Sequence, residues 1–333
     1  MALKNGVRLK PPPFHFPGLR LSLQDDEHAT GLPTILVDKD ERLWLSHRSI
    51  SDCLHQELGV ERLNRIHQHL WWAGRPAAAR SLHRQRMRGR EIVPTQRADF
   101  HLLWAGQRIF VKPLPRYLLD HAFWEKHICP DPALHALACG LLVSYTWLIR
   151  HDTDLALAKE THLVDAWLDW PTWRRLVENL AEGVDLNGTA MINPRYAYGE
   201  LRIKRLNQIY RFAKPGGLRD VVSGYASGYH SYTGFFRENF GWIITFFGFG
   251  SIVLSALQVG NGLESLESHE KFRRLSSILA LLALLAPFAI AAVSLLLFTC
   301  LFGHHLAQTV RYHRKKEQLR RTWNESINDR LNN

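Results

Sequence analysis

The residues best suited to chemistry form the run His151-Asp152-Thr153-Asp154. Three further polar residues follow it, namely Lys159, Glu160 and His162. An Asp-x-Asp pair can hold a divalent metal ion beside a diphosphate or nucleotide-sugar substrate. Such pairs usually lie in loops at strand ends, whereas this one follows an apolar helical stretch. The alternative is that Asp152 or Asp154 caps a helix beginning near Leu155. We favour the capping interpretation, and His151, Asp152 and Asp154 are the candidates for a catalytic role.

No other set of residues has the spacing of a known catalytic or cofactor motif. The 18 histidines invite a search for a triad, but the chain has no Gly-x-Ser-x-Gly elbow. A Walker loop, a Rossmann glycine pattern, HExxH and paired CxxC are also absent. The cysteines are far apart and predict neither a disulfide framework nor a zinc site. The sequence therefore predicts no cofactor and no metal, and it leaves open whether the chain is an enzyme.

Composition places the chain near an average protein, but the charge is unusual. Of the 333 residues, 46% are hydrophobic and 22% are charged, and the net charge is +11. Such a charge suits either nucleic acid or anionic lipid, so its placement along the chain must decide.

Two uncharged apolar runs lie near the C-terminus, at residues 240–259 and 278–302. Each is long enough as a helix to cross a hydrocarbon core of about 30 Å. Basic residues flank the pair on both sides, which predicts cytosolic termini by the positive-inside rule. We therefore expect an integral, multi-pass membrane protein, in the endoplasmic reticulum rather than in other membranes. The basic residues of the tail are expected to bind lipid headgroups and not nucleic acid: Arg311, Arg314, Lys315, Lys316, Arg320 and Arg321.

The fold class that we predict is α+β and mostly helical, with a cytosolic domain followed by a C-terminal transmembrane helical hairpin. The cytosolic domain contains a small antiparallel β-hairpin near 99–114, because two β-rich runs flank Ala105-Gly106-Gln107. Glu91-Ile-Val is a candidate third strand, and helices follow residue 116. The four expected parts are an N-terminal arm with a short helix (1–75), the cytosolic domain (76–233), the transmembrane hairpin (234–303) and a basic tail (304–333).

The helices of the cytosolic domain are predicted from apolar periodicity and from Pro and Gly at helix ends. The clearest runs from Pro171 to Glu182, and others span 49–69, 117–128 and 199–213. The stretch 132–150 is very apolar but short for a span. A buried core helix is favoured there, and whether the stretch touches or spans the membrane stays open.

Several short motifs along the chain carry a family resemblance: Leu70-Trp-Trp-Ala-Gly-Arg-Pro76, Gly89-Arg-Glu-Ile-Val93, Arg108-Ile-Phe-Val-Lys-Pro-Leu-Pro-Arg116, Trp170-Pro-Thr-Trp173, Tyr198-Gly-Glu-Leu-Arg202, Arg205-Leu-Asn-Gln-Ile-Tyr210 and Phe235-Phe-Arg-Glu-Asn-Phe240. Through them the chain resembles an uncharacterised family of fungal two-helix membrane proteins. The resemblance covers residues 65 to 315. It implies a fungal source and leaves open a role in secondary-metabolite biosynthesis. Because the family has no established activity, it implies no catalytic residue.

Three functions fit these observations. The first is a membrane-anchored accessory or scaffold protein, whose partners are membrane lipids and, through the membrane helices, other pathway proteins or copies of itself. The second is a membrane-associated enzyme acting on a lipophilic polyketide or terpenoid intermediate. The third is an oligomeric channel or transporter component. An enzyme should have a pocket where groups such as His151, Asp152, Asp154, Arg116 or Glu200 converge, and a scaffold should have none.

Overall fold

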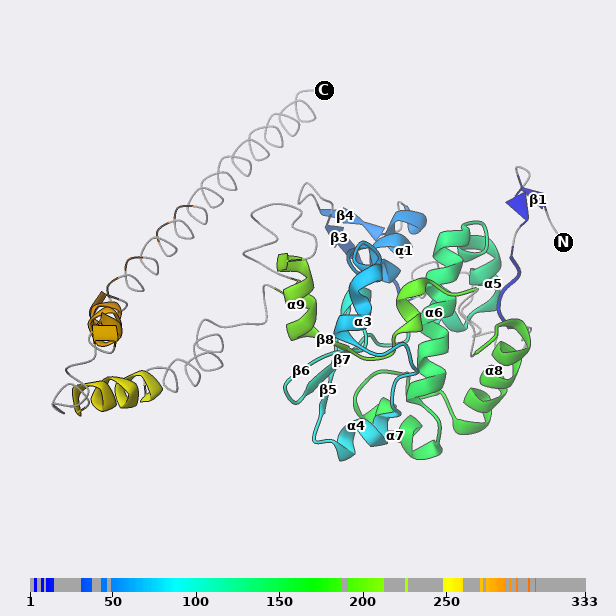
Figure 1. Cartoon of the computed structure of the whole chain (residues 1–333). Coiled ribbons are helices and arrows are strands. Elements are labelled where there is room, and N and C mark those ends of the chain that lie inside the picture. Colours follow the sequence, from blue (N-terminus) through cyan, green and yellow to red (C-terminus); the bar gives the residue numbers. More distant parts are fainter. Residues whose placement is uncertain are drawn as a thin grey trace, which may run out of the picture. The chain divides into compact units, whose positions relative to one another are not determined.

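The computed structural model describes residues 3–4, 7–8, 10–14, 31–37, 43–46, 49–186, 191–212, 225–226, 248–259, 270–271 and 274–285, with single positions at 288, 292, 299 and 303. The chain divides into two compact units, Met1–Tyr229 and His230–Asn333. The sheet, the buried core and the candidate site all belong to the first unit (Figure 1).

The first unit contains a mixed four-stranded sheet with the strand order β5-β7-β6-β8. β6 (Leu103–Ala105) and β7 (Arg108–Val111) form the predicted antiparallel hairpin. β5 (Glu91–Pro94) lies parallel to β7, and β8 (Leu201–Arg202) lies parallel to β6. The hairpin is therefore confirmed, but it forms the centre of a sheet whose outer strands come from distant parts of the chain.

The strands also form two small antiparallel ribbons, β1 (Leu3–Lys4) with β2 (Val7–Arg8) and β3 (Ile35–Val37) with β4 (Leu43–Leu45). The helices of the first unit are, in chain order, α1 (Ile50–Leu58), α2 (Glu61–Asn64), α3 (Leu70–Ala73), α4 (Leu82–Met87), α5 (His121–Phe123), α6 (Pro132–Leu148), α7 (Asp152–Glu160), α8 (Trp170–Gly183) and α9 (Ile203–Phe212). Short turns of 3₁₀ or π helix lie between them.

Three of the predicted helices are shorter than the periodicity suggested. The run 117–128 is divided into a 3₁₀ turn, the short helix α5 and a π-helical turn. The run 49–69 breaks after α1 because Gly59 takes an extended conformation with φ −64° and ψ 132°. α9 begins at Ile203 rather than near Gly199, because the two residues before it pair with β6 as β8. In these last two places the break comes from backbone pairing or conformation that the apolar pattern does not report.

The core of the first unit is organised around α6, which is buried along most of its length. Asp131 caps its N-terminus and accepts hydrogen bonds from the backbone N–H groups of the first turn. The Tyr145 hydroxyl donates to the Lys112 carbonyl just beyond β7 (2.6 Å), and the Trp173 indole of α8 donates to the Ile149 carbonyl (3.2 Å). α6 thus links the sheet to α8, and in Figure 1 it lies between them.

The predicted transmembrane hairpin is wrong. Among the described residues no single helix is long and apolar enough to cross a membrane, and α6 and α7, which reach that length only together, are bent by 114°. Within the two apolar runs the described helices are Gly248–Val259 and Arg274–Leu285. At 1.5 Å per residue the first is about 18 Å long, against a hydrocarbon core of about 30 Å.

Without the transmembrane hairpin, the predicted fold class and the predicted membrane localisation are also wrong. The fold is α+β with a mixed four-stranded sheet, and the expectation of an integral, multi-pass membrane protein is overturned by the lengths of the described helices. Hydropathy measures how apolar a run is and does not by itself set the length of a helix. The six basic residues of the tail lie outside the described residues.

Candidate functional site

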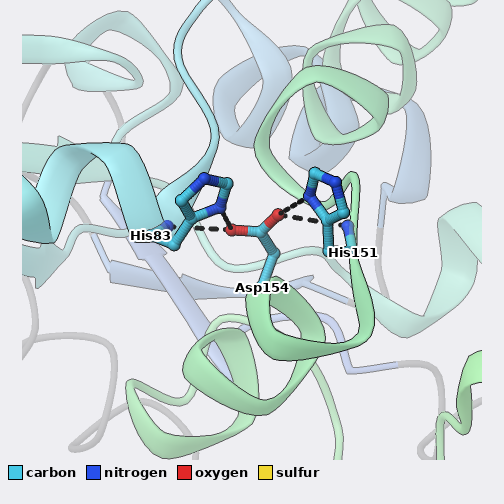
Figure 2. A group of neighbouring side chains, drawn as sticks. All are labelled: His83, His151 and Asp154. Atoms are coloured by element: carbon cyan, nitrogen blue, oxygen red, sulfur yellow. Dashed lines mark hydrogen bonds and ion pairs between the residues drawn. The ribbon is translucent and has the colours of Figure 1, made fainter.

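Asp154, in the first turn of α7, is the centre of the candidate site (Figure 2). Its carboxylate is fully buried. Oδ1 accepts the backbone N–H of His83 (2.8 Å), while Oδ2 accepts those of Arg150 (3.2 Å) and His151 (3.1 Å). His83 lies in the first turn of α4, and His151 is the residue immediately before α7. One carboxylate therefore satisfies N–H groups at the start of two helices, which would otherwise lack partners.

The imidazole rings of His83 and His151 flank the same carboxylate. Nδ1 of His83 lies 2.8 Å from Oδ1, and Nδ1 of His151 lies 3.4 Å from Oδ2. An ionised carboxylate can only accept, so each Nδ1 carries the hydrogen that it shares with Asp154. Figure 2 shows both rings turning Nδ1 towards the carboxylate from opposite sides. The side chains of His83 and His151 are 32% and 65% exposed, so solvent reaches the cluster from both rings.

The charge of Asp154 is set by a competition between burial and hydrogen bonding. Burial by itself would raise the pKa of this carboxyl. The bonds from the His83 amide, the His83 ring and the Arg150 amide outweigh burial, and the pKa is lowered from its ordinary value. Asp154 is therefore an ionised, tightly oriented carboxylate at neutral pH.

The three side chains offer a set of metal ligands. Their ligand atoms all lie within 4.8 Å of one another. Two imidazoles and one carboxylate suit Zn²⁺ and other divalent transition metals. In tetrahedral geometry, bonds of roughly 2.0–2.2 Å to such an ion place neighbouring ligand atoms about 3.3–3.6 Å apart. The separation of 3.4 Å between His151 Nδ1 and Oδ2 matches this value, whereas the 2.8 Å between His83 Nδ1 and Oδ1 would have to lengthen when an ion binds.

The structure brings together only part of the run named in the sequence. His151 and Asp154 meet, but Asp152 is exposed and does not join the cluster. Residues two apart on a helix point to different sides, so the Asp-x-Asp pair cannot converge in α7. His83 was not among the candidate residues, and no local motif marks it. Only the packing of α4 against α7 places it beside Asp154.

Arg116 and Glu200, the two further candidates for a shared pocket, pair with other residues. Arg116 makes a bidentate ion pair with Asp165 (2.6 and 2.9 Å). Glu200 accepts hydrogen bonds from Arg80, Gln85 and Arg90 in a network that holds β8 against the segment before β5. Neither belongs to the cluster around Asp154.

Comparison with known proteins identifies a family but no activity. No curated protein and no solved structure matches the chain. The expectation of an uncharacterised family is confirmed, because a protein family described only as a family of unknown function (DUF6601) matches residues 50–287. Since this match covers more than half of the chain, the protein belongs to the DUF6601 family.

Proposed function

We propose that this chain is a metal-binding protein in which His83, His151 and Asp154 hold one divalent transition-metal ion. The observation that carries the proposal is the convergence of three ligand atoms from three residues within 4.8 Å. The ion would be held by Nδ1 of each neutral imidazole and by the Asp154 carboxylate. Each ring would then carry its single hydrogen on Nε2 instead of on Nδ1.

The imidazole of His83 is additional to what helix capping needs, whereas His151 also forms the capping box of α7 with Asp154. Three backbone N–H groups already satisfy Asp154 at the starts of α4 and α7. If Asp154 only capped the two helices through backbone amides, position 83 could hold a residue of any type. The amides hold the carboxylate ionised and oriented whether or not an ion is bound, which is the support that a metal ligand requires.

Three protein ligands leave coordination positions for water and for a substrate. Three ligands with an open fourth position are the arrangement of catalytic rather than structural zinc. The exposure of both histidine side chains gives such a substrate access. The proposal therefore favours metal-assisted chemistry over a purely structural role. The fungal source, the metabolic pathway and the accessory role inferred from the sequence stay predictions.

The test is a titration of the full-length, chelator-treated chain with Co²⁺, followed by visible absorption, and with Zn²⁺, followed by calorimetry. We expect one ion per chain and a loss of affinity of at least about tenfold in either His83→Ala or His151→Ala. His69→Ala is the matched control, because this histidine contacts Gln68 rather than a carboxylate.

Two results would contradict the proposal. One is affinity unchanged in both variants, and the other is an equal loss in His69→Ala. Because an ion displaces protons from its ligands, we also expect the affinity for Co²⁺ to fall as the pH is lowered. Affinity independent of pH would contradict coordination by imidazole.

A further inference from the structure

A pocket of about 430 Å³ lies beside the C-terminal end of α7, the opposite end of this helix from Asp154. Its wall is formed by two chain segments, 112–116 after β7 and 159–166 at the end of α7, together with Gly31, Glu57 and Gln96. The Leu114 backbone N–H donates to the Leu163 carbonyl (2.8 Å) and joins the two segments. The pocket thus lies between two segments that are hydrogen-bonded to each other.

The turn that ends α7 shapes one side of this pocket. Backbone N–H groups of His162 and Leu163 donate to the carbonyls of Lys159 (3.0 Å) and Ala158 (2.8 Å). These two bonds define a Schellman motif, with His162 in the left-handed conformation at φ 55°. The motif reverses the chain, so that the segment after α7 returns along 112–116 and Lys159 remains at the rim.

Both carboxylates of the pocket are already paired. Glu57 accepts from Lys112 at 2.7 Å, and Lys112, only 1% exposed, also donates to the Gln96 carbonyl. Asp165 is held by the bidentate pair with Arg116. The positive and negative charges of these two ion pairs therefore cancel.

Lys159 is the cation of the pocket lining that belongs to neither of these ion pairs. It is half-buried, and among the described residues its ammonium group has no ion-pair or hydrogen-bond partner. The lining therefore holds the cations Lys112, Arg116 and Lys159 against the carboxylates Glu57 and Asp165. An unpaired cation beside apolar groups is stabilised by a complementary anion.

We infer that this pocket binds a small organic acid, with the acid group paired to Lys159 and an apolar body against Pro113, Leu114 and Val164. The chemical class follows from the lining, which combines Lys159, unpaired among the residues that the structure describes, with prolines and aliphatic side chains. The inference does not depend on metal binding, because the residues that carry it are separate from His83, His151 and Asp154.

The test uses calorimetry on the full-length chain with 4-phenylbutyrate as the probe and with 4-phenylbutanamide, its neutral counterpart, as the comparison. We expect saturable binding of the acid and affinity for the amide at least about tenfold lower. Lys159→Gln should weaken binding of the acid by about tenfold and leave Co²⁺ binding unchanged. Arg88→Gln, which removes one exposed positive charge outside the pocket, is the matched control.

Three results would overturn the inference: no saturable binding of 4-phenylbutyrate, equal affinity for the amide, or equal weakening by Arg88→Gln. Chemical denaturation of Lys159→Gln shows whether the variant is folded. Its Co²⁺ titration, run separately, distinguishes a failure of this inference from a failure of the metal proposal.

Discussion

At the scale of single residues, Asp154 joins parts of the chain that are far apart in sequence. Its carboxylate accepts backbone N–H groups from the starts of α4 and α7, and its two imidazole neighbours come from the same two places. Hydrogen bonds to the charged form outweigh burial and lower its pKa. The ionised state therefore stabilises the fold, besides supplying the proposed ligand.

Asp154→Asn should lower the free energy of unfolding at pH 7 by about 1–3 kcal/mol, because the amide nitrogen cannot accept the bonds that the carboxylate oxygen accepts. Chemical denaturation of the full-length chain measures the change. Asp152→Asn is the control, since Asp152 is exposed and lies outside the cluster. An equal effect of the two substitutions would show that only the local charge of α7 matters.

The effect of Asp154→Asn should depend on pH. The folded-state pKa of this carboxyl is lowered below its unfolded value of about 3.9. Its contribution to stability is therefore fully present above the unfolded value and is lost as the pH falls through the folded value. The difference in unfolding free energy between Asp154→Asn and the natural chain should shrink below about pH 4. A constant difference from pH 7 to pH 3 would contradict an ionised Asp154.

At the scale of elements, α7 carries a proposed site at each end. Its first turn holds Asp154, and its last turn and Schellman motif hold Lys159 and His162. The left-handed position of such a motif is usually glycine, because a Cβ atom is crowded there. His162 occupies it at φ 55°, at the edge of the pocket.

His162→Gly should raise the free energy of unfolding by about 0.5–1 kcal/mol, because glycine removes the cost of the left-handed conformation. Thermal or chemical denaturation checks the sign. The neighbouring Thr161 has φ −94° and lies outside the left-handed region, so Thr161→Gly should lower stability instead. Destabilisation by both substitutions would mean that the His162 side chain contributes more than its backbone conformation costs.

At the scale of the whole molecule, the first unit completes its core near its own C-terminal end. A second apolar cluster joins Phe100, Leu103 and Phe110 of the sheet region to residues of α9 and to Tyr225 and Ala226. The Tyr225 hydroxyl donates to the Asp99 carbonyl (2.7 Å), and Asn207 accepts the backbone N–H groups of Tyr225 and Ala226. α9, Tyr225 and Ala226 thus cover part of the sheet.

A fragment ending at Tyr229 should therefore fold by itself, with one cooperative unfolding transition and with the Co²⁺ stoichiometry of the full chain. A fragment ending at Arg202 is the control. It lacks α9 and Tyr225, leaves the second cluster exposed and should not fold cooperatively. Cooperative folding of the shorter fragment would show that the second cluster is dispensable.

Local signals predicted several elements well. Asp169, Pro171 and the final Gly183 lie within a few residues of the ends of α8, which was predicted from 171 to 182 and runs from Trp170 to Gly183. Gly106 takes a left-handed φ of 57° in the predicted hairpin. Its loop is one residue shorter than expected, because Ala105 pairs with Arg108.

The sequence by itself determined the elements whose causes lie within one turn or one hairpin: the Pro and Gly ends of α8, the β6–β7 hairpin and the apolar core stretch 132–150. The tertiary structure alone decided the parallel pairings of β5 and β8, the meeting of His83 with Asp154, and the place of Lys159 in the lining of the pocket. Apolar periodicity, caps and turn glycines act over a few residues, whereas a strand partner, a ligand set or a pocket depends on which distant segments pack together.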